Sequence, residues 1–89
     1  MKIKFYDDND KEYDSIEFFV NNINKNADEL NLISLITPKG MPKEEISDYY
    51  HWFTQLLKDK GVTNFGILIV PSKDEVPVIQ KIKIEKEDD

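Results

Sequence analysis

The sequence contains no cysteine and no arginine. Without cysteine it has no disulfide framework, no thiolate nucleophile and no cysteine-ligated zinc site, a composition that fits the reducing cytoplasm. Without arginine it lacks the planar fork that binds phosphate groups and guanine edges in a bidentate manner. The net charge of −6, from 18 acidic residues against 12 lysines, adds electrostatic repulsion, so direct binding of nucleic acid is not expected.

Long apolar runs are also missing. None approaches the roughly 18 residues needed to cross a bilayer, and the opening stretch MKIKFYDDND turns acidic before a signal-peptide core could form. We therefore expect a soluble, cytoplasmic protein with no membrane partner. The scarcity of alanine beside abundant lysine, isoleucine and asparagine indicates an AT-rich genome, as in a low-GC bacterium or phage. The chain is expected to form a single domain over residues 1–89, with a disordered acidic tail at 86–89.

Hydrophobic periodicity predicts the element order β-α-β-α-β-β. Alternation in residues 2–6 predicts a half-buried strand, and the DDND turn after it predicts a short N-terminal hairpin with residues 11–14 as its second arm. The nearly continuous apolar runs 30–38 and 64–72 predict central, parallel strands joined by helix crossovers. The segment 76–89 predicts a half-exposed strand paired antiparallel with the one before it. The result is an α/β fold of two-layer α+β type, with a mixed four-stranded sheet and two helices.

The first predicted helix follows the hairpin. Asp14 lies three residues before Glu17, which fits a capping box and places the start of the helix there. An inward stripe is formed by residues at helical spacing, namely Ile16, Phe19, Val20, Ile23 and Ala27. Phe18 lies about 200° from Ile16 around the helix, on the polar side, and is not part of this stripe.

The second predicted helix spans residues 42–61, with Pro42 suited to its first turn and Gly61 to its end. Its buried stripe comprises Ile46, Tyr49, Tyr50, Phe53, Leu56 and Leu57. Trp52 lies at the margin of that stripe. Its ring either folds over Leu56 as a boundary core residue or stands out between Glu45 and Asp59 as an interface anchor, a role in which tryptophan is common.

The acidic stretch 7–17 does not match a calcium loop. With Asp8 as the first ligand, Tyr13 occupies the position that requires glycine and Phe19 the position that requires glutamate. No metal site or cofactor is therefore expected.

The sequence offers no convincing catalytic constellation either. His51, Ser47 and Asp48 lie on consecutive turns of one helix, where they cannot surround a substrate carbonyl and have no oxyanion hole beside them. The segment TPKGMPKEE has one glycine and lacks the glycine-lysine-serine/threonine sequence of a Walker loop. We expect no catalytic residues and no enzymatic activity.

The leading hypothesis is a small acidic, non-enzymatic module that binds a basic surface on another protein. If that surface is the nucleic-acid site of an enzyme, the module acts as an inhibitor, a role that would fit a gene of a phage or other mobile element. The expected contact residues combine carboxylates with aromatic anchors: Trp52, Glu44, Glu45, Asp48, Asp59 and Phe18.

Two alternatives remain open at this point. If both helices cover the same face of the sheet, the apolar strands would expose a surface through which an accessory subunit could form a homodimer. The other alternative is a small enzyme or anion-binding domain that uses His51 together with the loop 38–43.

Overall fold

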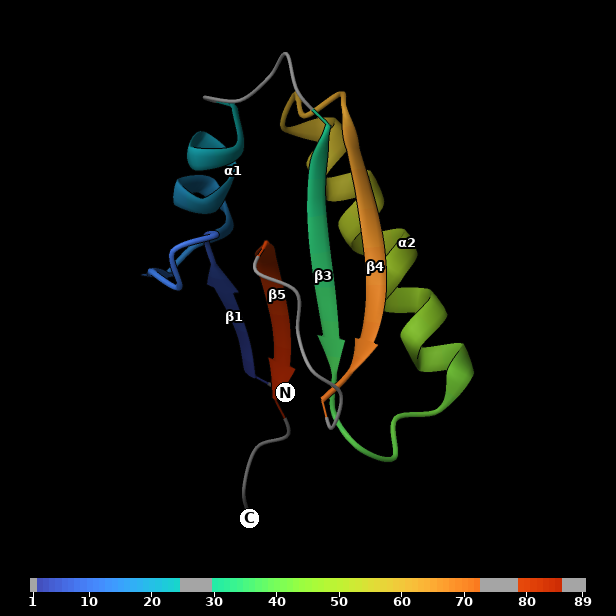
Figure 1. Ribbon diagram of the computed structural model, residues 1–89. Coiled ribbons are helices and arrows are strands. Elements are labelled where there is room, and N and C mark those ends of the chain that lie inside the picture. Colours follow the sequence, from blue (N-terminus) through green and yellow to red (C-terminus); the bar gives the residue numbers. More distant parts are fainter. Residues whose placement is uncertain (1, 25–29, 73–78, 86–89) are drawn as a thin grey trace.

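The computed structural model describes residues 2–24, 30–72 and 79–85, so Ala27 and the predicted acidic tail at 86–89 lie outside the described residues. Its elements in chain order are β1 (Lys2–Tyr6), β2 (Glu12–Tyr13), α1 (Ile16–Asn24), β3 (Asn31–Thr37), α2 (Lys43–Asp59), β4 (Phe65–Pro71) and β5 (Gln80–Glu85) (Figure 1). The predicted two-helix α+β fold is confirmed. The sheet has five strands and not four, because the short arm of the N-terminal hairpin pairs as β2.

The sheet is mixed, with strand order β2-β1-β5-β3-β4. Strand β3 runs parallel to both of its neighbours, β4 and β5, while β1 runs antiparallel to β5 and to β2. The helix crossover through α2 therefore joins parallel neighbours, as predicted. The crossover through α1 does not, because β1 and β5 lie between β2 and β3.

The predicted antiparallel pairing of the last strand with β4 is wrong, since β5 lies between β1 and β3. Its alternation is compatible with this position. Ile82 and Ile84 are only 0% and 2% exposed on the helix side, in a strand flanked by β1 and β3. Lys81 and Lys83 point to the opposite side, where the side chain of Lys83 is 41% exposed and that of Lys81 only 12%.

Strand β4 was predicted to be central from its apolar run, but it forms an edge of the sheet. Leu68 and Ile69 are 46% and 47% exposed there. An apolar run alone does not separate a central strand from an apolar edge, because the position of a strand is set by pairing with distant segments.

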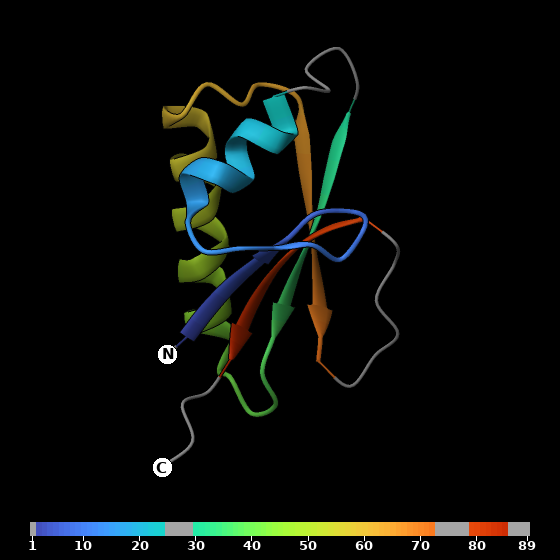
Figure 2. The same cartoon turned by 90° about the vertical axis from the view of Figure 1, so that its left-hand side faces the viewer.

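Both helices lie on one face of the sheet (Figure 2). They form a single core with the strand residues that point to that side. The core residues are Phe5, Phe19, Val20, Ile23, Ile33, Leu35, Met41, Phe53, Leu57, Val62, Ile82 and Ile84. The other face carries exposed Leu32 and Leu68 near β4 and lysines near β1 and β5.

The ends of α2 follow the predicted signals. Pro42 is the N-cap residue, and the chain leaves the helix at Gly61, whose φ of 88° is favourable for glycine. The N–H of Gly61 donates to the carbonyl of Lys58 (3.0 Å) and that of Val62 to the carbonyl of Leu57 (3.0 Å), the bond pattern of a Schellman motif. Because Val62 and Leu57 are both buried, this motif also fixes where the chain turns toward β4.

The start of α1 differs by one residue from the prediction. Ser15, and not Asp14, caps the helix, because its Oγ accepts a hydrogen bond from the N–H of Phe18 (3.4 Å). Serine is as good a cap as aspartate, so the sequence signal did not distinguish the two neighbours.

The acidic turn between β1 and β2 is organised by Asp7, a buried residue. One carboxylate oxygen accepts the backbone N–H groups of Asn9 and Lys11 (2.9 Å each), and the other accepts the hydroxyl of Tyr13 (3.0 Å). Burial acts to raise the pKa of Asp7, but these hydrogen bonds to the ionised form outweigh it and hold the pKa below its ordinary value. Asp10 in the same turn adopts φ 63°, which aspartate tolerates.

Replacing Asp7 by alanine should lower the free energy of unfolding by about 2–3 kcal/mol, because two amides and a hydroxyl lose a charged acceptor. Asp7→Asn should cost less, since its side-chain oxygen still accepts from the amides. A carboxyl group with a lowered pKa stabilises the fold above the unfolded-state value of 3.8 and loses that contribution as the pH falls below it. Urea unfolding at neutral pH and below pH 3.8 should therefore show a wild-type advantage over Asp7→Asn that shrinks in acid. An advantage independent of pH would contradict this role.

Candidate functional site

Trp52 is the most prominent exposed aromatic residue of α2. Its side chain is 51% exposed, and its ring centroid lies 4.9 Å from that of Phe53 and 6.2 Å from that of Tyr49. Phe53 is itself buried, so the indole is supported from the core side while half of it meets solvent. The ring thus lies against Phe53 and Tyr49 while about half of Trp52 is exposed.

The position of Trp52 around α2 follows from its neighbours. Ile46, Ser47 and Tyr50 border a hollow of about 300 Å³ together with Ile69 of β4, so this flank of the helix faces β4. Trp52 follows Tyr50 by two residues and lies about 160° away from it around the helix. The indole therefore occupies the flank of α2 that is turned away from β4.

Carboxylates border Trp52 on the same side of the helix. Glu45, Asp48 and Asp59 lie seven, four and seven positions from it, spacings that bring side chains to a common face. Asp59 accepts a hydrogen bond from the side chain of Gln55 (2.9 Å). Among the residues described, no lysine forms an ion pair with these carboxylates or with the exposed Glu44.

The acidic residues of the N-terminal hairpin and of α1 behave differently. Asp10 pairs with Lys81, Glu12 with Lys4 (3.7 Å) and Glu17 with Lys60 (3.8 Å). These ion pairs form at the surface between residues of the same chain. They offset part of the negative charge of the hairpin and α1. The carboxylates Glu44, Glu45 and Asp48 of α2 therefore keep more of their negative charge than the acidic residues of the hairpin and α1 do.

A shallow hollow of about 230 Å³ adjoins the indole and is lined by Asp48, Tyr49 and Trp52. An aromatic wall beside a carboxylate suits a lysine ammonium or arginine guanidinium group, because the ring face attracts a cation and the carboxylate pairs with it. Tyr49 was assigned from its spacing to the core alone. Its position three residues before Trp52 was the signal that it also borders the same surface.

Phe18 is 63% exposed, in agreement with its predicted place outside the buried stripe. It lines a hollow of about 370 Å³ formed by the hairpin and α1, among residues that include Tyr13 and Asn22. That hollow and the one beside Trp52 have no lining residue in common. The structure therefore does not bring the two predicted aromatic anchors into one site.

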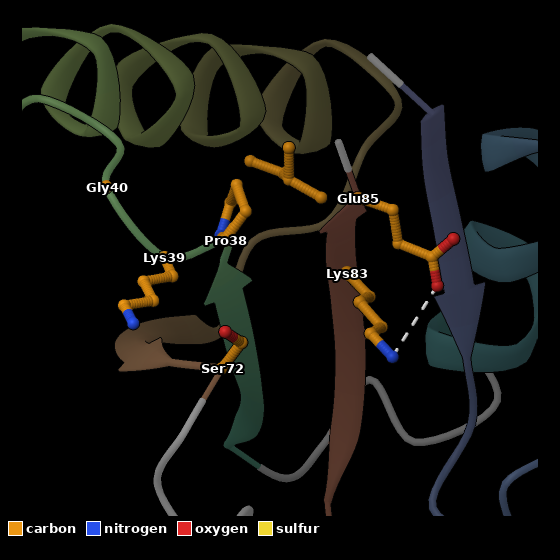
Figure 3. Close-up of a pocket in the computed structure, with 7 residues that line it drawn as sticks. Pro38, Lys39, Gly40, Ser72, Lys83 and Glu85 are labelled. Carbon is orange, nitrogen blue, oxygen red and sulfur yellow. Dashed lines mark ion pairs between the residues drawn. The ribbon is translucent and has the colours of Figure 1, made fainter. Parts of the chain in front are cut away.

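The loop 38–43 borders a different hollow, of about 580 Å³, at the carboxyl ends of the parallel strands (Figure 3). The lining residues are Pro38, Lys39, Gly40, Ser72, Lys83, Ile84 and Glu85. Lys83 pairs with Glu85 (3.5 Å), and Figure 3 shows the side chain of Lys39 directed away from it. His51 is absent from the lining and lies exposed on α2, so the loop and the histidine do not form one site.

Comparison of the chain with protein-family models, curated proteins and solved structures found no match. No group of three or more histidine, aspartate or glutamate side chains in the described ranges is arranged to hold a metal ion. Within the same ranges, neither helix has the length and apolar character needed to span a bilayer. The acidic face of α2 combines the exposed ring of Trp52 with Glu45 and Asp48, which form no ion pair with a described lysine. The hollow of the hairpin and α1 likewise places one such carboxylate, that of Asp14, beside the exposed ring of Phe18.

Proposed function

We propose that the protein is a small acidic, non-enzymatic module that binds a basic surface of another protein through α2. The observation that carries this proposal is the half-exposed ring of Trp52, supported by Phe53 and bordered by carboxylates without lysine partners among the described residues. A ring held in place by the core loses little conformational entropy on binding. Rigid aromatic residues of this kind commonly dominate the energy of an interface.

The chemistry of the surface favours basic side chains on the partner. Glu45 and Asp48 suit lysine or arginine, and the indole face of Trp52 offers a cation-π contact to the same groups. Basic surfaces with exposed lysine and arginine are typical of nucleic-acid-binding sites. A module docked there would exclude the nucleic acid, so inhibition by occlusion is the activity that we propose.

Charge and ring are expected to act on different rate constants. Glu45→Lys combined with Asp48→Lys should lower the association rate constant about tenfold or more at low salt, because steering by complementary charge is lost. Asp8→Lys with Asp14→Lys is the matched control, since it changes the net charge equally at two exposed residues of the hairpin region. Surface plasmon resonance on the captured partner measures both. Equal slowing by the two double variants would show that only net charge matters and not its position on α2.

The proposal as a whole is tested by capture from cells of the encoding organism. The wild-type protein, Trp52→Ala and Phe18→Ala serve as immobilised baits, and bound proteins are identified by mass spectrometry. We expect a basic protein that the wild-type and Phe18→Ala baits retain and the Trp52→Ala bait loses. Adding the wild-type protein should then displace nucleic acid from that partner. Identical retention by all three baits, or retention of no protein, would contradict the proposal.

A further inference from the structure

The two edges of the sheet differ in how they are protected. Strand β2 has only two residues and includes Glu12, which pairs with Lys4. Strand β4 has seven residues and lies within residues 61–72, a stretch without charge in a chain of which 34% is charged. Proteins normally protect an exposed edge with charge, shortness or a bulge, because its free backbone groups pair readily with another strand. The edge at β4 has neither charge nor shortness.

Within the described part of the chain, the backbone groups of β4 that form no bond in the sheet can be assigned from the bonds at its two ends. The carbonyl of Asn64 accepts the N–H of Asn31 (2.9 Å), and the N–H of Ser72 donates to the carbonyl of Thr37 (2.9 Å). Because bonding alternates along a parallel ladder, the even-numbered residues between them face β3. The N–H and C=O groups of Phe65, Ile67 and Ile69 therefore point to the free edge.

Apolar side chains are exposed on both faces of this edge. On the open face of the sheet Leu68 is 46% exposed and Leu32 on the adjoining strand is 39% exposed. On the helix face Ile69 is 47% exposed and borders the hollow that it shares with Ile46 and Tyr50. A strand added at this edge would cover apolar side chains on both faces of the sheet. It would also form hydrogen bonds with the outward N–H and C=O groups of β4.

We propose that β4 pairs antiparallel with β4 of a second copy of this chain, about a twofold axis at Ile67. In this register Phe65 faces Ile69 of the second copy, and only the three outward residues form the ladder. Pro71, which has no N–H to donate, stays outside it. Gly66 faces Leu68 of the second copy, and the missing side chain leaves room for that leucine beside Leu32, whose Cδ2 lies 3.5 Å from the position of a Cβ on Gly66.

A second copy fits this edge better than another partner because of charge. A twofold axis brings the same strand of both copies together, so charges of one sign on this strand would lie close to charges of the same sign on the other copy. Residues 61–72 carry none, and on a chain of net charge −6 they are where two copies approach with least repulsion. Trp52 lies on the flank of α2 turned away from β4, so the pairing leaves both acidic faces free and makes the dimer bivalent.

The absence of native cysteine allows a direct test with single-cysteine variants. In the proposed register the two Cα atoms of residue 67 are about 5.5 Å apart, within the range that a disulfide spans. The two Cα atoms of residue 69 are roughly 14 Å apart, too far for a disulfide. Mild oxidation should therefore cross-link Ile67→Cys into a covalent dimer and leave Ile69→Cys uncross-linked. Equal cross-linking of the two variants, or none for Ile67→Cys, overturns the register.

Sedimentation of unmodified protein tests the dimer without cysteine chemistry. The wild-type protein should sediment as a dimer that dissociates on dilution, and Leu68→Lys should sediment as a monomer. Leu30→Lys is the matched control, because Leu30 is 59% exposed and lies outside β4. We expect this control to remain dimeric. A wild-type protein that is monomeric at every concentration, or a Leu68→Lys variant that dimerises like the control, overturns the proposal.

Discussion

Replacing Phe53 by alanine should lower the free energy of unfolding by about 3–5 kcal/mol, the usual cost of removing a buried phenylalanine. Phe53 is 1% exposed, and its ring meets Phe5 of β1 (6.5 Å between centroids), Tyr49 (6.3 Å) and Trp52 (4.9 Å). Phe53 therefore connects α2 to strand β1, and its ring also supports the indole of Trp52 from the core side. Because domains of this size are stable by only about 5–15 kcal/mol, this loss removes between roughly a fifth and all of that stability.

Urea unfolding followed by circular dichroism measures this loss. Phe53→Leu is the matched control, since leucine refills most of the space and should cost less than about 1.5 kcal/mol. If the alanine variant unfolded at nearly the same urea concentration as the leucine variant, Phe53 would not be the link between α2 and the sheet that its contacts indicate.

Replacing Trp52 by alanine should weaken binding to the captured partner by about 2 kcal/mol or more, roughly a 30-fold rise in Kd. The loss should appear mainly in the dissociation rate constant, because a desolvated anchor holds the complex together after encounter. The half-exposed ring contributes less to folding than Phe53 does, so the variant should remain folded. This separation of affinity from stability distinguishes a binding residue from a core residue.

Two controls sharpen the Trp52 experiment. Trp52→Phe keeps an aromatic surface and should retain part of the affinity. Phe18→Ala removes a ring that is still more exposed, 63% against 51%, but lies in a separate hollow, and should leave Kd unchanged. Equal losses for Phe18→Ala and Trp52→Ala would contradict the assignment of the contact surface to α2.

Local signals allowed most of the secondary structure to be predicted. The helix predicted at 42–61 is found at Lys43–Asp59, because its apolar spacing, its proline and its terminal glycine all indicate the same boundaries. The strands predicted at 30–38 and 64–72 are found within those limits. Each of these signals depends on residues close together in the chain.

Strand order could not be predicted in the same way. The alternation that buries Ile82 shows that β5 has one buried face, but it does not identify Phe5 and Leu35 as the residues beside it. Those pairings join segments far apart in the sequence, and their energy depends on the whole core. The same limit explains why β4, with exposed Leu68 and Ile69, was predicted to be central.

The candidate site was predictable in part. Helical spacing placed Trp52 with Glu45 and Asp59 on one face of a helix, and the structure contains that helix at Lys43–Asp59. Spacing within one helix carried no information about Phe18 on the other helix, so the sequence grouped two rings that line separate hollows. Nor could it show that Glu12 and Glu17 are paired with lysines, because each pair joins residues of two different elements.

The central claim, that the face of α2 around Trp52 is the partner-binding surface, can be measured through the fluorescence of Trp52 itself. The chain has a single tryptophan, so the emission reports on one known position. Titration with a captured partner domain that lacks tryptophan should shift the emission to shorter wavelength and reduce quenching by acrylamide, because binding removes water from the exposed half of the ring. A complex that forms while the emission and the quenching of Trp52 stay as in the free protein would contradict the claim.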